Sequence, residues 1–338
     1  MSTTVEQITT VNTAFSYFLK NIVNLNAETT QKARASRDWL FQQIHAMPGK
    51  HADFPLLYTD VDTAYGSFAR RTKIRELDDI DLIVGVNAVG SVYSQSGDSI
   101  NIYVADGTRL RELCFDGTNR LNSRKVINRF IKYLHEVPQY SKAESGRNGS
   151  AAVLNLSSYT WSFDIVPGFF TKPEWDGRTY YLIPDGNGYW MKTDPRIDQA
   201  RVTAINQQHN GNVLNVVRIL KYWQRRPTMP TARSYLFECI VLGYYEEKLT
   251  PASAYVDLEI SAALSHVASA ILSDVNDPKG IQGNINHLSW EDRVKISNRA
   301  SEDATKAASA RKAEQDGDHK ESIRLWGEIF GYAFPSYG

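Results

Sequence analysis

The stretch GSFARRTKIRELDDIDLIVGV, residues 66–86, decides the fold. It sets two carboxylates, Asp79 and Asp81, at the start of a run that otherwise has the composition of a buried β-strand. A carboxylate in an apolar core is unfavourable unless it is paired or binds a cation. Because residues i and i+2 of a strand point to the same face, Asp79 and Asp81 should project together, opposite to Ile80.

Two carboxylates held side by side repel each other, and a divalent cation is their natural compensation. For an isolated Asp-x-Asp pair, a solvent-facing edge strand with a polar face is the alternative. Upstream, Gly66 lets a backbone approach a phosphate closely. Ser67, at the start of a short helix, offers its hydroxyl and helix amides to an anion. Taken alone, Gly-Ser is also an ordinary turn.

A third carboxylate, Asp164, lies in the stretch WSFDIVPGF, within a second hydrophobic strand. It would be unremarkable as a strand-end aspartate with local hydrogen bonds. A third aspartate on a neighbouring strand is, however, what a two-metal phosphoryl-transfer site requires, with its ions about 3.5–4 Å apart. Asp164 is therefore the third candidate ligand.

The composition excludes several classes of protein. The 338 residues contain 38 Lys plus Arg and 38 Asp plus Glu, and this zero net charge argues against a protein whose main task is gripping duplex nucleic acid. Two distant cysteines, Cys114 and Cys239, form no zinc ribbon or disulfide scaffold and suit a reducing compartment. We find no secretory leader and no apolar run approaching about 20 residues, so we expect a cytoplasmic protein with no membrane partner.

The periodicity predicts a mixed α/β half followed by a helical half. Expected strands lie at 56–65, 80–86, 151–156 and 160–166, with a loop or hairpin at 85–98 and loops at 47–54 and 171–195. Expected helices lie at 4–24, from 26 into the forties, and at 107–117, 121–136, 197–209, 212–225, 232–247, 252–273, 290–315 and 319–330.

Gly-Ser, eleven residues, Asp-Ile-Asp and a distant strand Asp together form a specific pattern. The pattern resembles the nucleotidyltransferase superfamily of the DNA polymerase β type. Within it, GSFARRT…DDIDLIV is similar to the bacterial cGAS/DncV-like nucleotidyltransferases, the CD-NTases. The resemblance covers essentially the whole chain, including VLNVVRILKYWQRR, SYLFE and SIRLWGEIFGYAFPSYG. One departure is Arg71, where many relatives carry glycine.

The resemblance implies a bilobed α+β fold. Residues 1–195 would form a polymerase β-like nucleotidyltransferase core with a mixed sheet and long N-terminal helices. Residues 196–338 would form an α-helical C-terminal lobe.

By the same resemblance, Gly66 and Ser67 hold the donor triphosphate. The catalytic and metal-binding carboxylates, which take Mg²⁺ or Mn²⁺, are Asp79, Asp81 and Asp164.

The helical lobe carries three further residues that the resemblance assigns to nucleotide binding. Lys221 and Ser234 match phosphate contacts, and Tyr235 matches an aromatic that stacks on a base. From the residues alone, Lys221 could be solvated, Ser234 could sit in the first turn of a helix capped by Thr231, and Tyr235 could be core.

The implied activity is metal-dependent synthesis of a cyclic di- or trinucleotide second messenger for anti-phage (CBASS) signalling. The substrates are nucleoside triphosphates: ATP, with GTP, UTP and CTP as further candidates. A downstream effector senses the product. Metazoan relatives that sense DNA carry a Cys/His zinc insertion, which this chain has too few cysteines to form, so we expect no obligatory nucleic-acid activator.

The chain ends FPSYG, and some relatives are joined through their last residue to a target by a ubiquitin-transfer-like partner. Gly338 is therefore a candidate conjugation site, with a frayed end as the alternative. Two other functions share the aspartates: a nucleotidyltransferase that modifies a protein or tRNA, and a non-catalytic nucleotide-binding protein.

Overall fold

The computed structural model describes residues 7–97, 99–140, 143–156 and 159–338. The described chain divides into two compact units. The sheet unit comprises Ala27–Ala69 and Glu76–Arg196. The helical unit comprises the N-terminal segment up to Asn26, the short segment Arg70–Arg75, and Ile197–Gly338.

The sheet unit contains a nine-stranded mixed sheet in the order β1-β2-β7-β8-β9-β4-β3, with β6 against β7 and β5 against β6. The pair β2–β7 is parallel, and the other strand pairs formed by described residues are antiparallel. The strands are β1 (Thr63–Tyr65), β2 (Asp79–Gly85), β3 (Val92–Ser96), β4 (Ser99–Tyr103), β5 (Glu144–Asn148), β6 (Ala151–Asn155), β7 (Ser162–Phe170), β8 (Tyr181–Pro184) and β9 (Trp190–Thr193).

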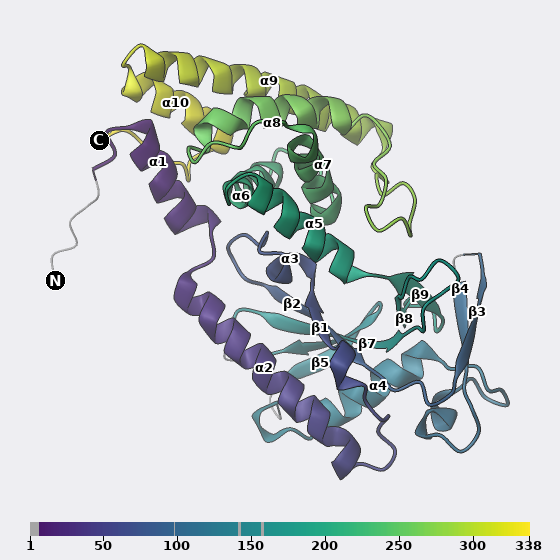
Figure 1. Cartoon of the computed structure of the whole chain (residues 1–338). Helices are drawn as coiled ribbons and strands as arrows, with labels where there is room; N and C mark the ends of the chain where they lie inside the picture. The colour runs from purple at the N-terminus through teal and green to yellow at the C-terminus, as the bar shows by residue number, and fades with distance from the viewer. Residues whose placement is uncertain (1–6, 98, 141–142, 157–158) are drawn as a thin grey trace. The chain divides into compact units, whose positions relative to one another are not determined.

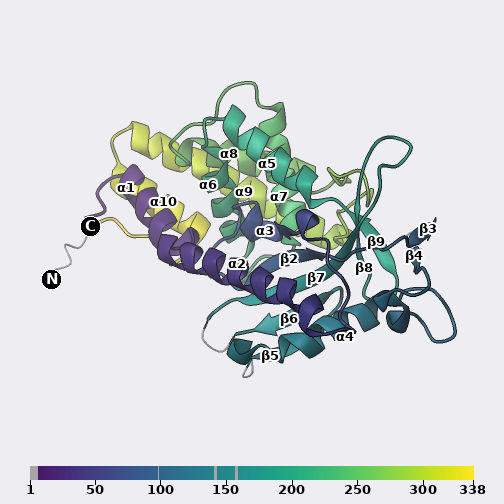
Figure 2. The same ribbon diagram turned by 60° about the horizontal axis from the view of Figure 1, so that its bottom comes forward.

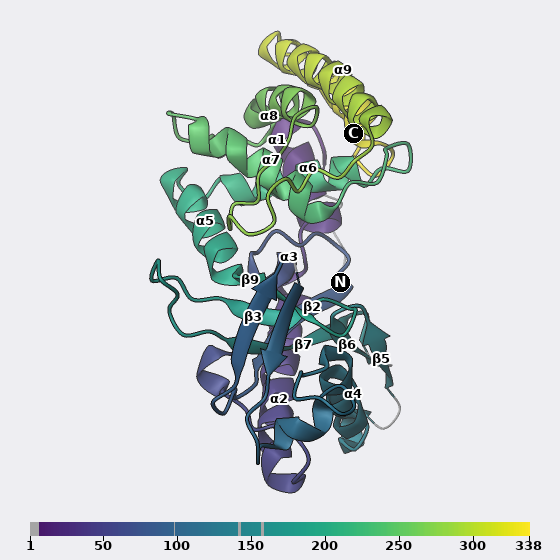
Figure 3. The ribbon, with the colours of Figure 1, turned by 90° about the vertical axis from the view of Figure 1, so that its right-hand side faces the viewer.

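The α-helices that the described residues form in this unit are α2 (Ala27–Lys50), α3 (Gly66–Ala69) and α4 (Ser123–Leu134). Asn122 caps α4 by accepting from two backbone N–H groups, and α4 lies beside β5 and β6 (Figure 2). The mostly exposed β3 pairs antiparallel with β4, which buries Ile100 and Ile102, and the pair is seen face-on in Figure 3. Phe54, which follows α2, packs on Phe130 of α4 with ring centroids 4.8 Å apart, and both side chains are fully buried.

The helical unit contains α1 (Val11–Phe18), a π-helical turn (Leu19–Val23), α5 (Pro195–Gln208), α6 (Val213–Gln224), α7 (Ser234–Glu247), α8 (Asp257–Ala270), α9 (Trp290–Gln315) and α10 (His319–Phe330). The helices α8, α9 and α10 lie side by side (Figure 1). Small buried residues at Ala300, Ala304 and Ala307 let these helices approach closely.

An aromatic cluster fixes α1 and the C-terminal tail within the helical unit. Phe15 packs edge-on against Trp326 and Phe334, with ring centroids 5.0 and 5.1 Å apart. Phe18 joins the cluster at 5.1 Å from Phe334. We expected both N-terminal helices to belong to the nucleotidyltransferase core. Instead, α1 belongs to the helical unit with the C-terminal helices, and α2 belongs to the sheet unit.

The helices after Pro195 are confirmed with small changes at their ends, whereas several predictions in the sheet unit are wrong. The expected helix at 107–117 is a short 3₁₀ turn, Arg109–Leu113. The strand expected from residue 56 begins at Thr63, and the expected loops at 171–195 contain β8 and β9. The helix α2 continues through Pro48 to Lys50, where a loop was expected.

No helix formed by the described residues is both long enough and apolar enough to span a bilayer.

Candidate active site

Three aspartates share one patch of the sheet. On β2, Asp79 and Asp81 are half-buried while Ile80 between them is fully buried, so the two carboxylates share a face as the alternation predicts. On β7, Asp164 is half-buried between buried neighbours and lies directly opposite Asp81 in the parallel register. Neighbouring strands lie about 4.8 Å apart, which makes these two residues adjacent.

Gly66 lies at the edge of this patch, against the side chain of Asp81. Tyr65, the last residue of β1, pairs with Asp81 across the antiparallel ladder, and Gly66 follows it with a positive φ of 70°. A Cβ at position 66 would overlap Oδ2 of Asp81 and lie 2.6 Å from its carboxyl carbon. Glycine is therefore required at position 66 for two reasons: the backbone has a positive φ, and Asp81 occupies the space that a side chain would need. Ser67 follows in α3.

The three carboxylates create a strongly negative patch. Burial raises the pKa of the Tyr65 hydroxyl well above its usual value, and the charges of Asp81, Asp164 and Asp79 raise it further. Tyr65 therefore stays neutral and can act as a hydrogen-bond donor. The same field favours a bound cation.

The donor set fits Mg²⁺ or Mn²⁺, which prefer carboxylate oxygens. Gly66 adds room at the patch that a side chain would fill. Among the described residues, no group of three or more His, Cys, Asp or Glu side chains is gathered as a ready metal-binding cluster. The backbone thus places the three aspartates together, and their side chains would have to turn toward a shared ion.

Lys221 on α6 lies deep in the helical unit, at 2% exposure of its side chain. Its ammonium group lies 2.5 Å from Oε1 of Glu238 and donates to the carbonyl of Thr72 at 3.0 Å. A phosphate contact would require the ammonium group to leave these partners. The structure shows Lys221 in contact with Glu238, and its role as a phosphate contact stays a prediction.

Tyr235 on α7 is half-buried in a polar cluster of the helical unit. Its hydroxyl donates to Asp198 at 2.7 Å and lies 3.1 Å from Asp277, and the ammonium group of Lys279 contacts it. The Arg70 guanidinium lies over its ring, 5.5 Å from the centroid. The ring packs against the hydrophobic core of the helical unit while its hydroxyl lies in the polar cluster, and its base-stacking role stays a prediction.

Ser234 begins α7 and is half-buried. The helix cap is Arg233, which makes no side-chain capping bond, so a cap by Thr231 is not what the structure contains. The phosphate role of Ser234 stays a prediction.

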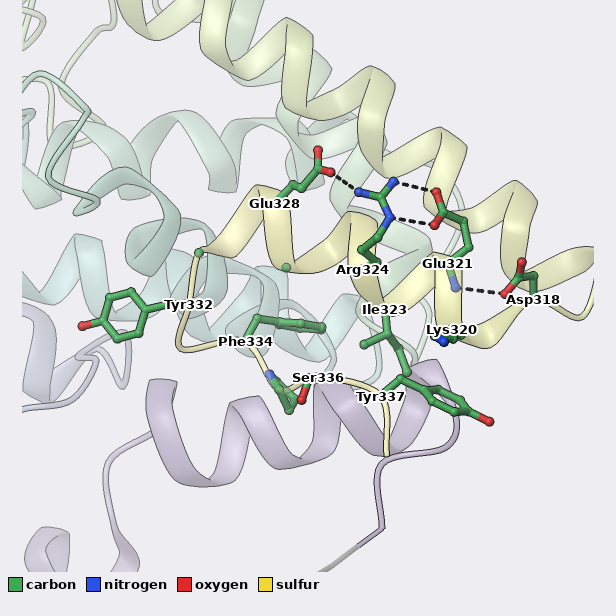
Figure 4. A pocket seen from close by; sticks show the side chains of 13 residues that line it. Asp318, Lys320, Glu321, Ile323, Arg324, Glu328, Tyr332, Phe334, Ser336 and Tyr337 are labelled. Carbon is green, nitrogen blue, oxygen red and sulfur yellow. Dashed lines mark hydrogen bonds and ion pairs between the residues drawn. The ribbon is translucent and has the colours of Figure 1, made fainter.

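The C-terminal residue is docked rather than frayed. The backbone of Gly338 exchanges two hydrogen bonds with that of Ile8, at 3.0 and 3.3 Å. The tail that precedes it and α10 line a pocket of about 770 Å³, in which Phe334 is buried and Arg324 is held by Glu321 and Glu328 (Figure 4).

Sequence reasoning missed two groups of residues. Tyr65 directly precedes the Gly-Ser turn, but nothing marks it in a one-dimensional pattern. Glu238 could have been found, because it is a lone charge inside the apolar run of α7 and is 1% exposed. Its partners, Arg70 and Lys221, are 168 and 17 residues away, so the grouping needed coordinates.

A mixed sheet with aspartates on adjacent parallel strands, beside a Gly-Ser turn, defines a nucleotidyltransferase. Over 333 residues the chain is 42% identical to a probable cyclic nucleotide synthase of Bacillus cereus strain VD146, covering 98% of this chain and 99% of that protein. An Escherichia coli MS 115-1 protein named cyclic AMP-AMP-AMP synthase is 25% identical, with 94% and 95% coverage. The chain therefore belongs to the bacterial cyclic nucleotide synthases, the CD-NTases, which are nucleotidyltransferase enzymes.

Solved structures show the same fold. The Escherichia coli MS115-1 CdnC structure with ATP has a TM-score of 0.69 at 18% identity, covering 96% of this chain and 99% of that one. Escherichia coli DncV, bound to 3'-deoxy GTP, has a TM-score of 0.63 at 12% identity, with 95% and 97% coverage. No family model matches the sequence. The predicted mixed-sheet nucleotidyltransferase fold with C-terminal helices is thereby confirmed.

Proposed function

We propose that this cyclic nucleotide synthase makes a cyclic di- or trinucleotide from ATP, alone or with a second nucleoside triphosphate, as a messenger in anti-phage (CBASS) signalling. The observation that carries the site assignment is the parallel β2–β7 register, which sets Asp81 beside Asp164. ATP is favoured because two relatives are named cyclic AMP-AMP-AMP synthases and CdnC was solved with ATP. A sensing effector would lie downstream.

In this proposal Asp79, Asp81 and Asp164 hold Mg²⁺ or Mn²⁺ against the donor triphosphate. The bound metal would neutralise phosphate charge and favour the ionised form of the attacking hydroxyl. The ribose hydroxyl of the acceptor nucleotide forms a bond to the α-phosphorus, the bond to the β-phosphate breaks, and pyrophosphate leaves. The linear product then acts as donor in the ring-closing step.

The remaining proposed roles concern binding. Gly66 and Ser67 hold the triphosphate by close backbone approach and a hydroxyl donor. Lys221 and Ser234 contact phosphates, and Tyr235 stacks on a base. Lys221 would have to exchange its contact with Glu238 for phosphate when nucleotide binds.

The test is to incubate the protein with labelled ATP, alone and with the other ribonucleotides, in the presence of Mg²⁺ or Mn²⁺. We expect a phosphatase-resistant small product from the wild type and none from Asp79→Asn or Asp81→Asn. The matched control is Asp78→Asn, which removes an exposed carboxylate one residue before the site and should remain active. Full activity in the two site variants would refute the assignment.

The same assay separates the alternative functions. Label in a protein or tRNA, without small product, would indicate a macromolecule-modifying enzyme. Nucleotide binding without turnover in any mixture would indicate a non-catalytic protein. An activity that requires added DNA or RNA would contradict our expectation that no nucleic-acid activator is needed.

We also propose a regulatory protein partner, since CdnC was solved in complex with a HORMA protein. A ubiquitin-transfer-like partner would join Gly338 to a target. Gly338 is exposed, but its backbone bonds to Ile8 would have to open first. Mass spectrometry with the partner, comparing the full chain with a chain lacking Gly338, tests this: an adduct should form only on the full chain.

A further inference from the structure

The six residues Arg70–Arg75 join the Gly66–Ser67 turn to the strand that begins at Asp79. They pack within the helical unit, whereas the residues on either side belong to the sheet unit. Three separate sets of contacts hold them, one at each end and one in the middle. Because the chain is continuous, a movement of this segment would be passed on to the Gly66–Ser67 turn before it and to the start of β2 after it.

Buried ion pairs hold the first end. Glu238 lies 3.0 Å from the Arg70 guanidinium through Oε2 and 2.5 Å from the Lys221 ammonium through Oε1. Lys221 in turn donates to the carbonyl of Thr72. Although burial opposes it, the charges of Arg70 and Lys221 lower the pKa of Glu238, which therefore stays ionised. One carboxylate thus holds two points of the segment, directly and through Lys221.

Two arginines hold the rest of the segment. Arg218 on α6 donates to the carbonyl of Arg71 at 3.0 Å. Arg75 donates through its guanidinium to the carbonyls of Asn21 and Asn24, at 2.7 and 3.1 Å. Its own N–H donates to the carbonyl of Val23 at 2.9 Å.

The segment also stores a strained conformation. Arg71 has a φ of 61°, in the left-handed region that favours glycine. A non-glycine residue remains there only when surrounding contacts over-determine it. The contacts of Arg70, Arg71 and Thr72 with α6 and α7 provide that constraint.

We propose that Glu238 is a positioning residue for nucleotidyl transfer, which through its ion pair with Arg70 fixes the segment between the triphosphate-binding turn and the metal-binding strand. This inference rests on the proposed function of Gly66, Ser67 and Asp79. Glu238 itself contacts Arg70 and Lys221 and none of the three proposed metal-binding aspartates. Its effect passes along the chain, over three residues from Arg70 to Ser67 and four from Arg75 to Asp79.

The experiment compares Glu238→Gln with Glu246→Gln. Both residues lie on α7 and pair with an arginine, but Glu246 is 44% exposed and pairs with Arg201 of α5, which is not part of the segment. At a temperature where circular dichroism shows both variants folded, we expect Glu238→Gln to lower kcat about tenfold. The KM for ATP and the Mg²⁺ concentration at half-maximal rate should both rise. Glu246→Gln should leave all three unchanged.

The KM for ATP and the Mg²⁺ concentration at half-maximal rate, called here the two midpoints, separate a positioning role from a merely structural one. A loss of folded protein lowers the rate in proportion to the amount lost and leaves both midpoints unchanged. Amide hydrogen exchange, measured without nucleotide, gives a second readout: Glu238→Gln should speed exchange across residues 70–76, and Glu246→Gln should not. Unchanged midpoints and unchanged exchange in Glu238→Gln would overturn the proposal.

If Glu238→Gln does not fold, Arg70→Lys takes its place, because it keeps the charge but loses the two-pronged donor. The same shifts in both midpoints are expected, and their absence would overturn the proposal. Asp79→Asn in the same assay tests the proposed function separately. If Asp79→Asn is active, the proposed catalytic site is refuted. If Asp79→Asn is inactive and Glu238→Gln is unaffected, only the positioning role is refuted.

Discussion

Replacing Gly66 by alanine is the most direct perturbation of the candidate site, since it adds one carbon atom and no charge. The new Cβ would overlap Oδ2 of Asp81 and lie 2.6 Å from its carboxyl carbon. Ordinary contact begins at 3.4 Å, so the carboxyl carbon has to move by about 0.8 Å and Oδ2, which lies closer to the new Cβ, by more. Asp81 would then be displaced from the patch that it shares with Asp79 and Asp164.

The size of the effect follows from this displacement and from the backbone. A shift of about 1 Å in a catalytic group lowers the rate about a hundredfold. Alanine at a φ of 70° also destabilises the fold by about 1–2 kcal/mol. We therefore expect Gly66→Ala to be folded, modestly destabilised, and about a hundredfold slower.

Gly117→Ala is the matched control. Gly117 has a φ of 71°, and no described atom beyond its chain neighbours lies within 4 Å of a Cβ built there. It carries the same backbone strain in the same unit without the clash. Urea unfolding measures the stability of both variants, and labelled-ATP turnover with Mg²⁺ measures the rate. Equal turnover by the two variants, at equal stability, would refute the argument that Gly66 makes room for Asp81.

Three further predictions concern stability. Asp81→Asn should unfold at a higher temperature than the wild type in EDTA, because it relieves repulsion among the carboxylates, and should lose the stabilisation that added Mg²⁺ gives the wild type in thermal scans. Glu238→Gln should lose about 3–5 kcal/mol near neutral pH, because two buried cations lose their partner. Since the folded-state pKa of Glu238 lies below its usual value of 4.5, the wild type should lose this advantage as the pH falls below 4.5, so the urea midpoints of the two proteins should converge there. Phe334→Ala should cost about 3–5 kcal/mol by urea unfolding and should speed carboxypeptidase removal of Gly338, with exposed Tyr332→Ala as the control.

The helical half of the fold was readable from sequence because its apolar residues recur at helical spacing. In α6, the residues Val213, Val216, Val217 and Leu220 follow that period and are all buried. The strands that sequence reasoning missed lack the corresponding signal. The mostly exposed β5 has the sequence ESGRN, so no apolar alternation marks it, and its pairing depends on β6.

The candidate site was predictable to the extent that it lies within single strands. Asp79 and Asp81 stand out because two carboxylates precede an apolar run. What sequence could not provide is the pairing: Asp81 and Asp164 are neighbours only because β2 and β7 are parallel and in register. The role of Glu238 was equally hidden, since its partner Arg70 lies 168 residues away.

The same apolar residues that stabilise the sheet also set the geometry of the site. Beyond the aspartates, β2 and β7 continue as buried runs, in which Leu82 and Ile83 lie opposite Ile165 and Val166 in the register. Because side chains alternate faces, a slip of one residue would turn Asp164 into the core and an apolar side chain toward Asp81. Burying the carboxylate of Asp164 is strongly unfavourable, so the shifted register is destabilised by this charge while the observed register is stabilised by the apolar runs. The requirements for the proposed metal-binding patch and for a unique sheet register therefore fall on the same few residues.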